Sequence, residues 1–128
     1  MDPVAQMLNE MKNAQAVSKE TVSFSYSNFK HEILKVLEKF DYISKVEKKG
    51  RGVKKVLDVI LKYEDGLPMI SSFKKVSKPS QRTYSPTSKI KSTKGGRGIV
   101  IVSTSKGVMP GFLAKKNNLG GEVICEIW

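Results

Sequence analysis

The sequence predicts an α+β fold of two small subdomains: an N-terminal α-β-α-β-β part and a C-terminal part that is mostly β with one short helix. Three observations on the 128-residue chain support this prediction. Apolar residues recur twice in the first half at the spacing of an amphipathic helix. Strand-like alternation or a short apolar run follows each of these stretches. The second half holds apolar runs separated by Gly, Pro and Ser, which indicates strands joined by loops.

Two amphipathic helices are expected in the first half. Asp2-Pro3 suits a helix start, because Asp accepts hydrogen bonds from unpaired N–H groups and Pro tolerates the first helical position. The apolar residues that follow share one helical face, and the helix should end near Val17. Ser27 or Asn28 can cap the second helix, whose apolar stripe runs from Phe29 to Phe40.

Three strands are expected between and after these helices. Thr21–Tyr26 alternates between polar and apolar residues in the manner of a strand. A short strand at Tyr42–Val46 and a long one at Val53–Tyr63 flank a turn at Lys48–Gly52. Because the turn is short, we expect these two strands to form a hairpin.

Glu64–Pro68 is the expected boundary between the subdomains, because it combines turn residues with a change in charge balance. Residues 1–65 carry 12 basic and 10 acidic side chains, a net charge of +2. Residues 66–128 carry 11 basic and 2 acidic side chains, a net charge of +9. We therefore assign residues 1–65 to an N-terminal α/β subdomain and residues 66–128 to a strongly basic, β-rich subdomain.

The second half is interpreted as strands with one short helix. Strands are expected at Met69–Val76, Arg82–Tyr84, Ile99–Val102 and Glu122–Trp128. Ile99–Val102 is apolar at every position, which is typical of a strand buried on both faces. The helix is expected at Met109–Lys116. Alternation in the last strand places three residues on one face: Val123, Cys125 and Ile127.

Composition favours a polyanion partner and excludes several classes of site. The net charge of +11 is the footprint of a nucleic-acid partner. Cys125 and His31 are the only residues of their types, so we expect no disulfide, no metal site and no cofactor. The longest apolar run is far shorter than a membrane span needs, and the opening residues lack the pattern of an export signal. We therefore expect no membrane partner and no small-molecule substrate.

The most informative segment is Ser103–Gly107, which follows the buried strand directly. Hydroxyl groups both donate and accept hydrogen bonds, so Ser103, Thr104 and Ser105 suit base edges and ribose 2′-OH groups. Lys106 can neutralise a phosphate, and Gly107 frees the backbone. The alternative is an ordinary strand-to-helix loop in which Ser and Thr act as caps.

Two enzyme motifs are partly matched by residues near this segment, but the sequence lacks the elements that complete them. Ser103 and Lys106 match S-x-x-K, but the S-D-N and K-T-G elements that accompany this motif are absent. Lys94–Gly98 is rich in Gly, but no G-x-x-x-x-G-K-[ST] phosphate loop occurs in the chain. The second half also has only two carboxylates, Glu122 and Glu126, for acid–base chemistry. We expect that the protein is not an enzyme.

Tyr84 and Arg82 offer a stacking surface and a positive charge in one basic stretch, which irregular or single-stranded RNA uses. The alternative is that Tyr84 packs in the core. Only three of the 23 basic residues are Arg, and Lys acts as a point charge rather than a bidentate reader of bases. This balance favours recognition of backbone and shape.

The sequence resembles the family of bacterial small-subunit ribosomal protein number eight. The segments that carry the resemblance are Asp2–Ala5, Met7-Leu8, Lys12–Ala14, Ser77–Tyr84, Ile101–Met109, Gly120–Cys125 and Trp128. They span the whole chain in matching order and spacing. The Ser-Thr-Ser-x-Gly segment, combined with a Gly-Gly-Glu strand near the end, is the most specific part.

The resemblance implies a structural, ribosome-bound cytoplasmic protein with two subdomains, of which residues 66–128 bind RNA. Its expected partners are the central domain of 16S ribosomal RNA, neighbouring small-subunit proteins (numbers five and twelve) and the messenger of its own operon, whose translation it would repress. The implied principal RNA contacts are Ser103, Thr104, Ser105, Gly107, Tyr84 and Glu122. Secondary contacts from the first half map onto Lys12, Asn13, Lys30 and Lys55. A non-ribosomal basic module that binds messenger RNA or DNA is the alternative.

Overall fold

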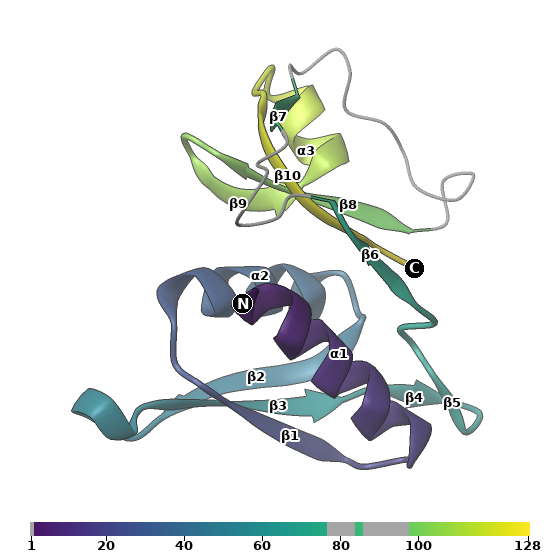
Figure 1. Ribbon diagram of the computed structural model, residues 1–128. Helices are drawn as coiled ribbons and strands as arrows, with labels where there is room; N and C mark the ends of the chain where they lie inside the picture. The colour runs from purple at the N-terminus through teal and green to yellow at the C-terminus, as the bar shows by residue number, and fades with distance from the viewer. Residues whose placement is uncertain (1, 77–83, 86–97) are drawn as a thin grey trace. The chain divides into compact units, whose positions relative to one another are not determined.

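The computed structural model describes residues 2–76, 84–85 and 98–128 (Figure 1). The chain divides into two compact units. The first is Pro3–Ile70, and the second is Ser71–Trp128 together with the N-terminal end of the chain. Helices, antiparallel sheets and the concentration of strands in the second unit confirm the predicted α+β class.

The first unit has the predicted α-β-α-β-β order. Its elements are α1 (Pro3–Ala16), β1 (Thr21–Ser25), α2 (Asn28–Lys39), β2 (Ile43–Lys49), the 3-10 turn η1 (Gly52–Lys54) and β3 (Val56–Leu61). The strands form an antiparallel sheet in the order β1-β3-β2, and both helices lie over one face of it (Figure 1). The Ser27 hydroxyl accepts a hydrogen bond from the Lys30 amide at 3.4 Å, so Ser27 is the cap of α2.

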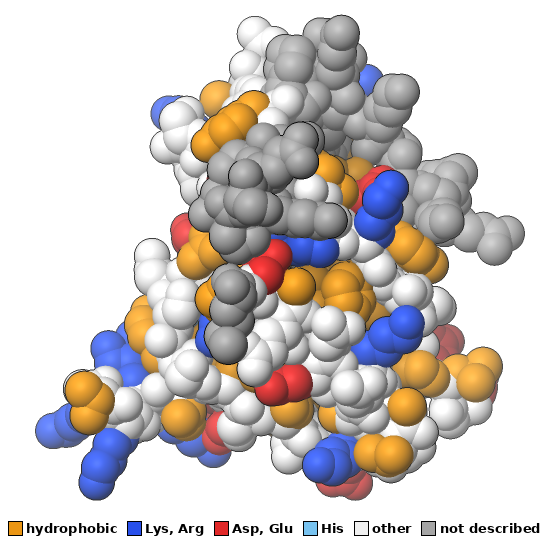
Figure 2. Space-filling model, viewed as in Figure 1, with side chains coloured by type: hydrophobic (Ala, Val, Ile, Leu, Met, Phe, Trp, Pro, Cys, Tyr) orange, Lys and Arg blue, Asp and Glu red, His pale blue; other side chains and the backbone are white. Residues whose placement is uncertain are grey.

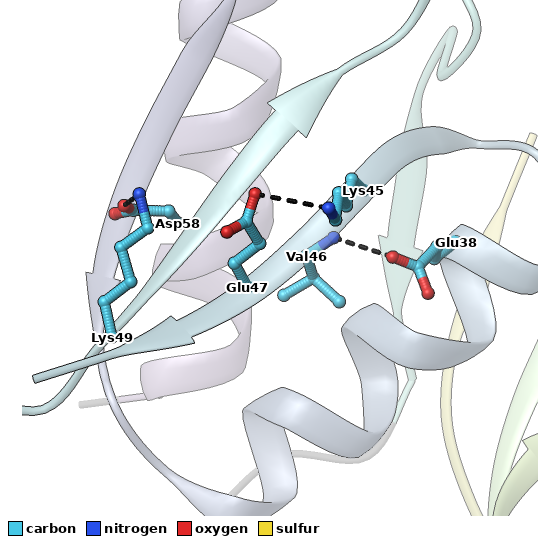
Figure 3. A network of polar contacts seen from close by, with 6 residues as sticks. All are labelled: Glu38, Lys45, Val46, Glu47, Lys49 and Asp58. Carbon is cyan, nitrogen blue, oxygen red and sulfur yellow. Dashed lines mark hydrogen bonds and ion pairs between the residues drawn. The ribbon is translucent and has the colours of Figure 1, made fainter.

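The core of this unit lies between the helices and the sheet. Each helix contributes a stripe of apolar residues, and every second residue of β3 is buried. The fully buried side chains are Met7, Met11, Ile33, Leu34, Leu37, Ile43, Leu57 and Val59. The Val46 amide also donates to the Glu38 carboxylate at 2.8 Å, which joins α2 to β2 (Figure 3).

The predicted hairpin between β2 and β3 is confirmed, but its turn was placed too early. β2 continues through Lys48 and Lys49, which were expected in the turn. Val53 lies in η1 instead of at the start of a strand, and β3 begins only at Val56. The Lys54 amide donates to the Arg51 carbonyl at 3.1 Å and so closes the 3-10 turn.

A second, very short hairpin occupies the expected boundary segment. β4 (Tyr63–Glu64) pairs with β5 (Leu67–Pro68) through a two-residue turn at Asp65-Gly66. Both turn residues have positive φ angles, 53° and 80° respectively, which is the geometry of the tight turns that suit the twist of a hairpin. The compact first unit ends shortly after this turn, at Ile70.

The second unit is built on a twisted antiparallel sheet with one helix. Its elements are β6 (Phe73–Lys75), β7 (Tyr84–Ser85), β8 (Ile99–Thr104), β9 (Gly107–Pro110), α3 (Gly111–Lys116) and β10 (Gly121–Ile127). The strand order is β6-β10-β8-β9, and β7 also pairs with β10. One face of the sheet packs on α3 through an apolar cluster that includes Val100, Val102, Met109 and Ala114.

Three expectations in this unit were wrong or too long. The strand expected at Met69–Val76 is limited to Phe73–Lys75. The helix expected from Met109 begins at Gly111, because the residues before it form the unpredicted strand β9. The strand at the chain end contains a register shift between Val123 and Cys125. Val123 pairs with Val102 and Cys125 with the adjacent Ile101, so they face opposite sides of the sheet.

Gln15 is a buried polar residue in the last turn of α1, and its side chain is only 4% exposed. Neither its Oε1 nor its Nε2 has a hydrogen-bond partner among the described residues. A buried polar group without a partner carries its full desolvation cost. We therefore expect Gln15→Met, which keeps a similar shape without polar atoms, to raise the free energy of unfolding by about 1–3 kcal/mol in urea denaturation.

The matched control for this prediction is Gln6→Met, which makes the same change at an exposed position of the same helix. It should alter the free energy of unfolding by less than about 0.5 kcal/mol. A Gln15→Met protein less stable than the parent would contradict the burial argument.

Candidate nucleic-acid interface

The Ser103–Gly107 segment forms the tip of the β8–β9 hairpin instead of a strand-to-helix loop. Ser103 and Thr104 are the last residues of β8, and Gly107 is the first of β9. Thr104 pairs with Gly107, so only Ser105 and Lys106 connect the strands, and both are exposed. Gly107 has a φ angle of 110°, which glycine adopts more readily than other residues, whereas Ser105 and Lys106 have no positive φ angle. Two paired strands therefore hold this tip.

The Thr104 hydroxyl is used inside the turn. It donates a hydrogen bond to the Gly107 carbonyl at 2.9 Å and accepts one from the Lys106 amide at 3.1 Å. By contrast, the Ser105 side chain makes no hydrogen bond to another described residue. The neighbouring hydroxyls thus have different roles: Thr104 fixes the turn, and Ser105 is available to a ligand.

Glu122 lies within a row of paired residues that crosses four strands. In β10 it pairs with Tyr84 of β7 on one side and with Ser103 of β8 on the other. Ser103 pairs in turn with Val108 of β9. Residues directly opposite each other in antiparallel strands place their side chains on the same face. Strand pairing therefore brings together three residues that are distant in the sequence.

Tyr84 is 70% exposed, so its side chain does not pack in the core. Ser103 and Glu122 are half-buried beside it. An exposed aromatic face can stack on a base or lie against a ribose. The hydroxyl beside it can donate or accept hydrogen bonds, and the carboxylate can accept them from sugar and base groups. The exposed Lys106 adds a positive charge at the hairpin tip.

Gly121 allows β10 to approach β8 closely at this point. A Cβ atom added to Gly121 would overlap the Ser103 carbonyl oxygen and lie 3.2 Å from the Thr104 Cα. Sequence reasoning placed Gly121 only in a turn after the helix and missed this contact. A Gly immediately before an expected strand was the available signal, because Gly residues in strands often mark a close approach of two backbones.

The remaining predicted contacts belong to the first unit or are not described. Lys12 and Asn13 are exposed on α1. The Lys30 ammonium lies 3.3 Å from the Ser25 hydroxyl, and the Lys55 ammonium lies 4.7 Å from the centre of the Tyr26 ring. Arg82 lies outside the described residues. The four described residues of this set thus belong to the first unit, whereas the hairpin tip belongs to the second.

The surroundings of Cys125 and His31 favour the uncharged form of each side chain. Burial raises the pKa of the Cys125 thiol to about 12, so it stays protonated at neutral pH. Burial and the nearby Lys35 lower the pKa of His31, so its imidazole is mostly neutral there. Within the described ranges, no three His, Cys, Asp or Glu residues gather as metal ligands would. None of the helices described here is long and apolar enough to cross a membrane.

Comparison with known proteins matches this chain to one family along almost its whole length. The family model described as "Ribosomal protein S8" matches residues 2–128. A protein named small ribosomal subunit protein uS8 from Vesicomyosocius okutanii subsp. Calyptogena okutanii (strain HA) is 46% identical over 127 residues, covering 99% of this chain and 97% of that protein. The protein of the same name from Bordetella petrii is 44% identical over 126 residues, covering 98% and 96% respectively.

The contact of Gly121 with β8 predicts that Gly121→Ala lowers the free energy of unfolding. The new methyl group would overlap the Ser103 backbone, and forcing such an overlap costs about 1–3 kcal/mol. Urea denaturation of the full chain measures the change. Gly120→Ala is the matched control, because Gly120 is exposed and has no positive φ angle. Equal effects of the two substitutions would refute the close approach.

Proposed function

The chain belongs to the ribosomal protein S8 family, and from this premise we propose that it binds the central domain of 16S ribosomal RNA directly. As a member of that family it is a structural protein of the small ribosomal subunit, it works on the ribosome in the cytoplasm, and it is not an enzyme. The proposal concerns the RNA segment that it contacts and the residues that make the contact.

One observation carries the proposal: a fixed hairpin tip with an exposed hydroxyl and ammonium lies next to a row of paired residues that contains an exposed aromatic ring. Ser105 and Lys106 are the exposed pair, and Tyr84 is the ring. RNA is recognised by its shape, by its 2′-OH groups and by stacking on irregular positions. The hairpin tip and Tyr84 together offer groups for each of these modes within one unit of the protein.

In the proposed complex each group has one task. The Ser105 hydroxyl contacts a ribose 2′-OH or a base edge, and Lys106 neutralises a phosphate. Tyr84 stacks on a base or packs against a ribose. Ser103 and Glu122 contact RNA hydroxyl or amino groups, whereas Thr104 keeps the turn in shape through its two internal hydrogen bonds. Gly107 supplies the backbone angle that the turn needs.

Further parts of the proposal rest on family membership and charge. Residues 66–128 would be the RNA-binding domain and residues 1–65 an accessory domain, with secondary RNA contacts from Lys12, Asn13, Lys30 and Lys55, and from Arg82 in the second half. Small-subunit proteins five and twelve would be its neighbours. Binding to the messenger of its own operon would repress that operon, provided the messenger presents the same RNA shape.

The experiment is a comparison of Ser105→Ala with the parent in binding to a transcript of the 16S central domain. Loss of a buried hydrogen bond should cost about 0.5–1.5 kcal/mol, which weakens binding by roughly 2–12-fold. Filter binding at fixed salt measures this change. Ser71→Ala is the matched control, because Ser71 is exposed in the same unit beside Trp128, at the other end of β10 from Glu122.

Unchanged affinity of Ser105→Ala, with unchanged folding, would remove Ser105 from the interface. Equal affinity of the parent for duplex DNA and for the 16S transcript would favour a general basic nucleic-acid-binding module instead. Repression of the operon is tested separately with a transcript of its messenger, which should compete with the 16S transcript for the protein.

A further inference from the structure

β1 is an edge of the sheet in the first unit, and it lacks the features that commonly protect an edge. The strand order is β1-β3-β2, so among the described strands β1 pairs on one side only. Its five residues include neither Lys nor Pro. The opposite edge, β2, carries three lysines, and its Val46 amide is already bonded to the Glu38 carboxylate. Because Lys and Pro are common means of keeping an edge from pairing with another chain, β1 is the less protected of the two edges.

Backbone hydrogen bonds identify the residues of β1 whose polar groups face outward. The Leu61 amide donates to the Glu20 carbonyl at 2.8 Å, and the Tyr26 amide donates to the Lys55 carbonyl at 3.0 Å. Successive residues of an antiparallel strand alternate between bonding to the partner strand and pointing away from it. The odd-numbered residues of β1 therefore point away from β3, and all of them are exposed: Thr21, Ser23 and Ser25.

α1 runs beside this edge and forms a groove with it. The groove is a hollow of about 270 Å³. Gln6, Met7 and Glu10 of α1 line one side of it, and Ser23 and Ser25 of β1 line the other. Lys30 of α2 completes the lining. The outward-facing backbone of β1 thus borders a hollow whose far wall is a helix.

Two opposite charges line the groove. The Lys30 ammonium lies 3.3 Å from the Ser25 hydroxyl and 3.5 Å from the Ser25 carbonyl oxygen, which places it at the end of β1. Neither Lys30 nor Glu10 forms an ion pair with a described residue. Figure 2 shows basic side chains gathered where the turn between β2 and β3 projects, whereas the surface over α1 and β1 is mostly uncharged. The groove therefore differs in charge from a surface built for a polyanion.

We propose that this groove binds an extended segment of another protein, which adds to the sheet as a fourth strand beside β1. The backbone of the segment would pair with the outward N–H and C=O groups of Ser23 and with the N–H of Ser25. Side chains that face the helix would lie against Met7, and a carboxylate of the segment would meet Lys30. The proposal goes beyond the proposed function, because the partner is a protein and the contacts are to the backbone of β1.

A protein segment fits the groove better than other ligands do. An extended chain repeats its N–H and C=O groups at the spacing of the strand edge, which neither RNA nor a small molecule does. The hollow is also smaller than the roughly 300–1,000 Å³ typical of small-molecule sites. RNA phosphates would meet the Glu10 carboxylate. Two copies of this chain repel each other through a charge of +11 each, whereas a segment that carries a carboxylate is attracted.

The experiment uses a labelled synthetic peptide of about six residues, in which valine and threonine alternate before a terminal aspartate. Its binding to the full chain is followed by fluorescence anisotropy, and amide hydrogen exchange at Ser23 and Ser25 is followed by NMR. We expect a Kd below about 1 mM and slower exchange of both amides in the complex. The same peptide with N-methyl groups on the amides that would face β1 should not bind.

Ser23→Pro removes the outward N–H without touching the hydrogen bonds between β1 and β3. It should weaken binding of the peptide by roughly 2–12-fold, as expected for one lost hydrogen bond. Ser23→Ala is the matched control, because it keeps the N–H and loses the same hydroxyl, which donates to the Asp58 carboxylate at 2.6 Å. This control should bind the peptide as the parent does.

Lys30→Gln tests the charge contact and should weaken binding of the aspartate peptide by about 2–5-fold. It should leave binding of a peptide with asparagine in place of the aspartate unchanged. Lys39→Gln is the control, because it removes the same charge from an exposed position of the same helix outside the groove. Unchanged urea denaturation of each variant shows that its effect comes from binding.

The proposal is overturned if the peptide does not bind at about 1 mM, if the N-methylated peptide binds equally well, or if Ser23→Pro and Ser23→Ala weaken binding equally. Protection of the two amides that rises with protein concentration alone would assign the edge to a second copy of the chain. Protection by the 16S central-domain transcript would assign it to RNA, and either result overturns the proposal. The peptide measurements contain no RNA, so their outcome is independent of the proposed function.

Discussion

The close approach of β10 to β8 at Gly121 is the constraint on which the candidate interface depends. β10 pairs with β6, β7 and β8, and its first two residues lie between β7 and β8. Where Gly121 meets Ser103 there is no room for a side chain. Because that contact sets the register, Glu122 stands directly between Tyr84 and Ser103. A shift of one residue would turn Glu122 to the opposite face and separate the row.

In the hairpin tip, two neighbouring hydroxyl groups have different roles. The Thr104 hydroxyl makes two hydrogen bonds within the turn, and these fix the backbone that presents Ser105 and Lys106. A tip already held in its bound shape loses little conformational entropy when it meets a ligand. The exposed hydroxyl can therefore contribute to affinity only because its neighbour is engaged within the protein.

The elements that were predicted correctly are those whose signal lies within their own sequence. Helical periodicity predicted α1 and α2, alternation predicted β1, and the apolar run predicted β8. β9 was missed because Gly107–Pro110 is short and ends in Pro, which suggested a loop and a helix start. The prediction that Val123 lies on the same face as Cys125 was wrong, because the register shift between them depends on pairing with another strand, which the local sequence does not reveal. The segment of the site was identifiable from residue types, but the roles of Thr104 and Gly121 depend on cross-strand contacts that no single segment reveals.

The distribution of charge follows from which lysines have carboxylate neighbours, and this matters more for the electric field than for stability. Exposed ion pairs such as Lys45–Glu47 contribute only about 0–1 kcal/mol each. Their larger effect is to cancel the field along the outer face of β2. The positive field is therefore concentrated where cations have no carboxylate neighbour, in the turn between β2 and β3 at residues 50–55. Since screening at physiological salt acts over about 8 Å, a concentrated group of cations attracts a polyanion more strongly than the same charges spread evenly over the surface.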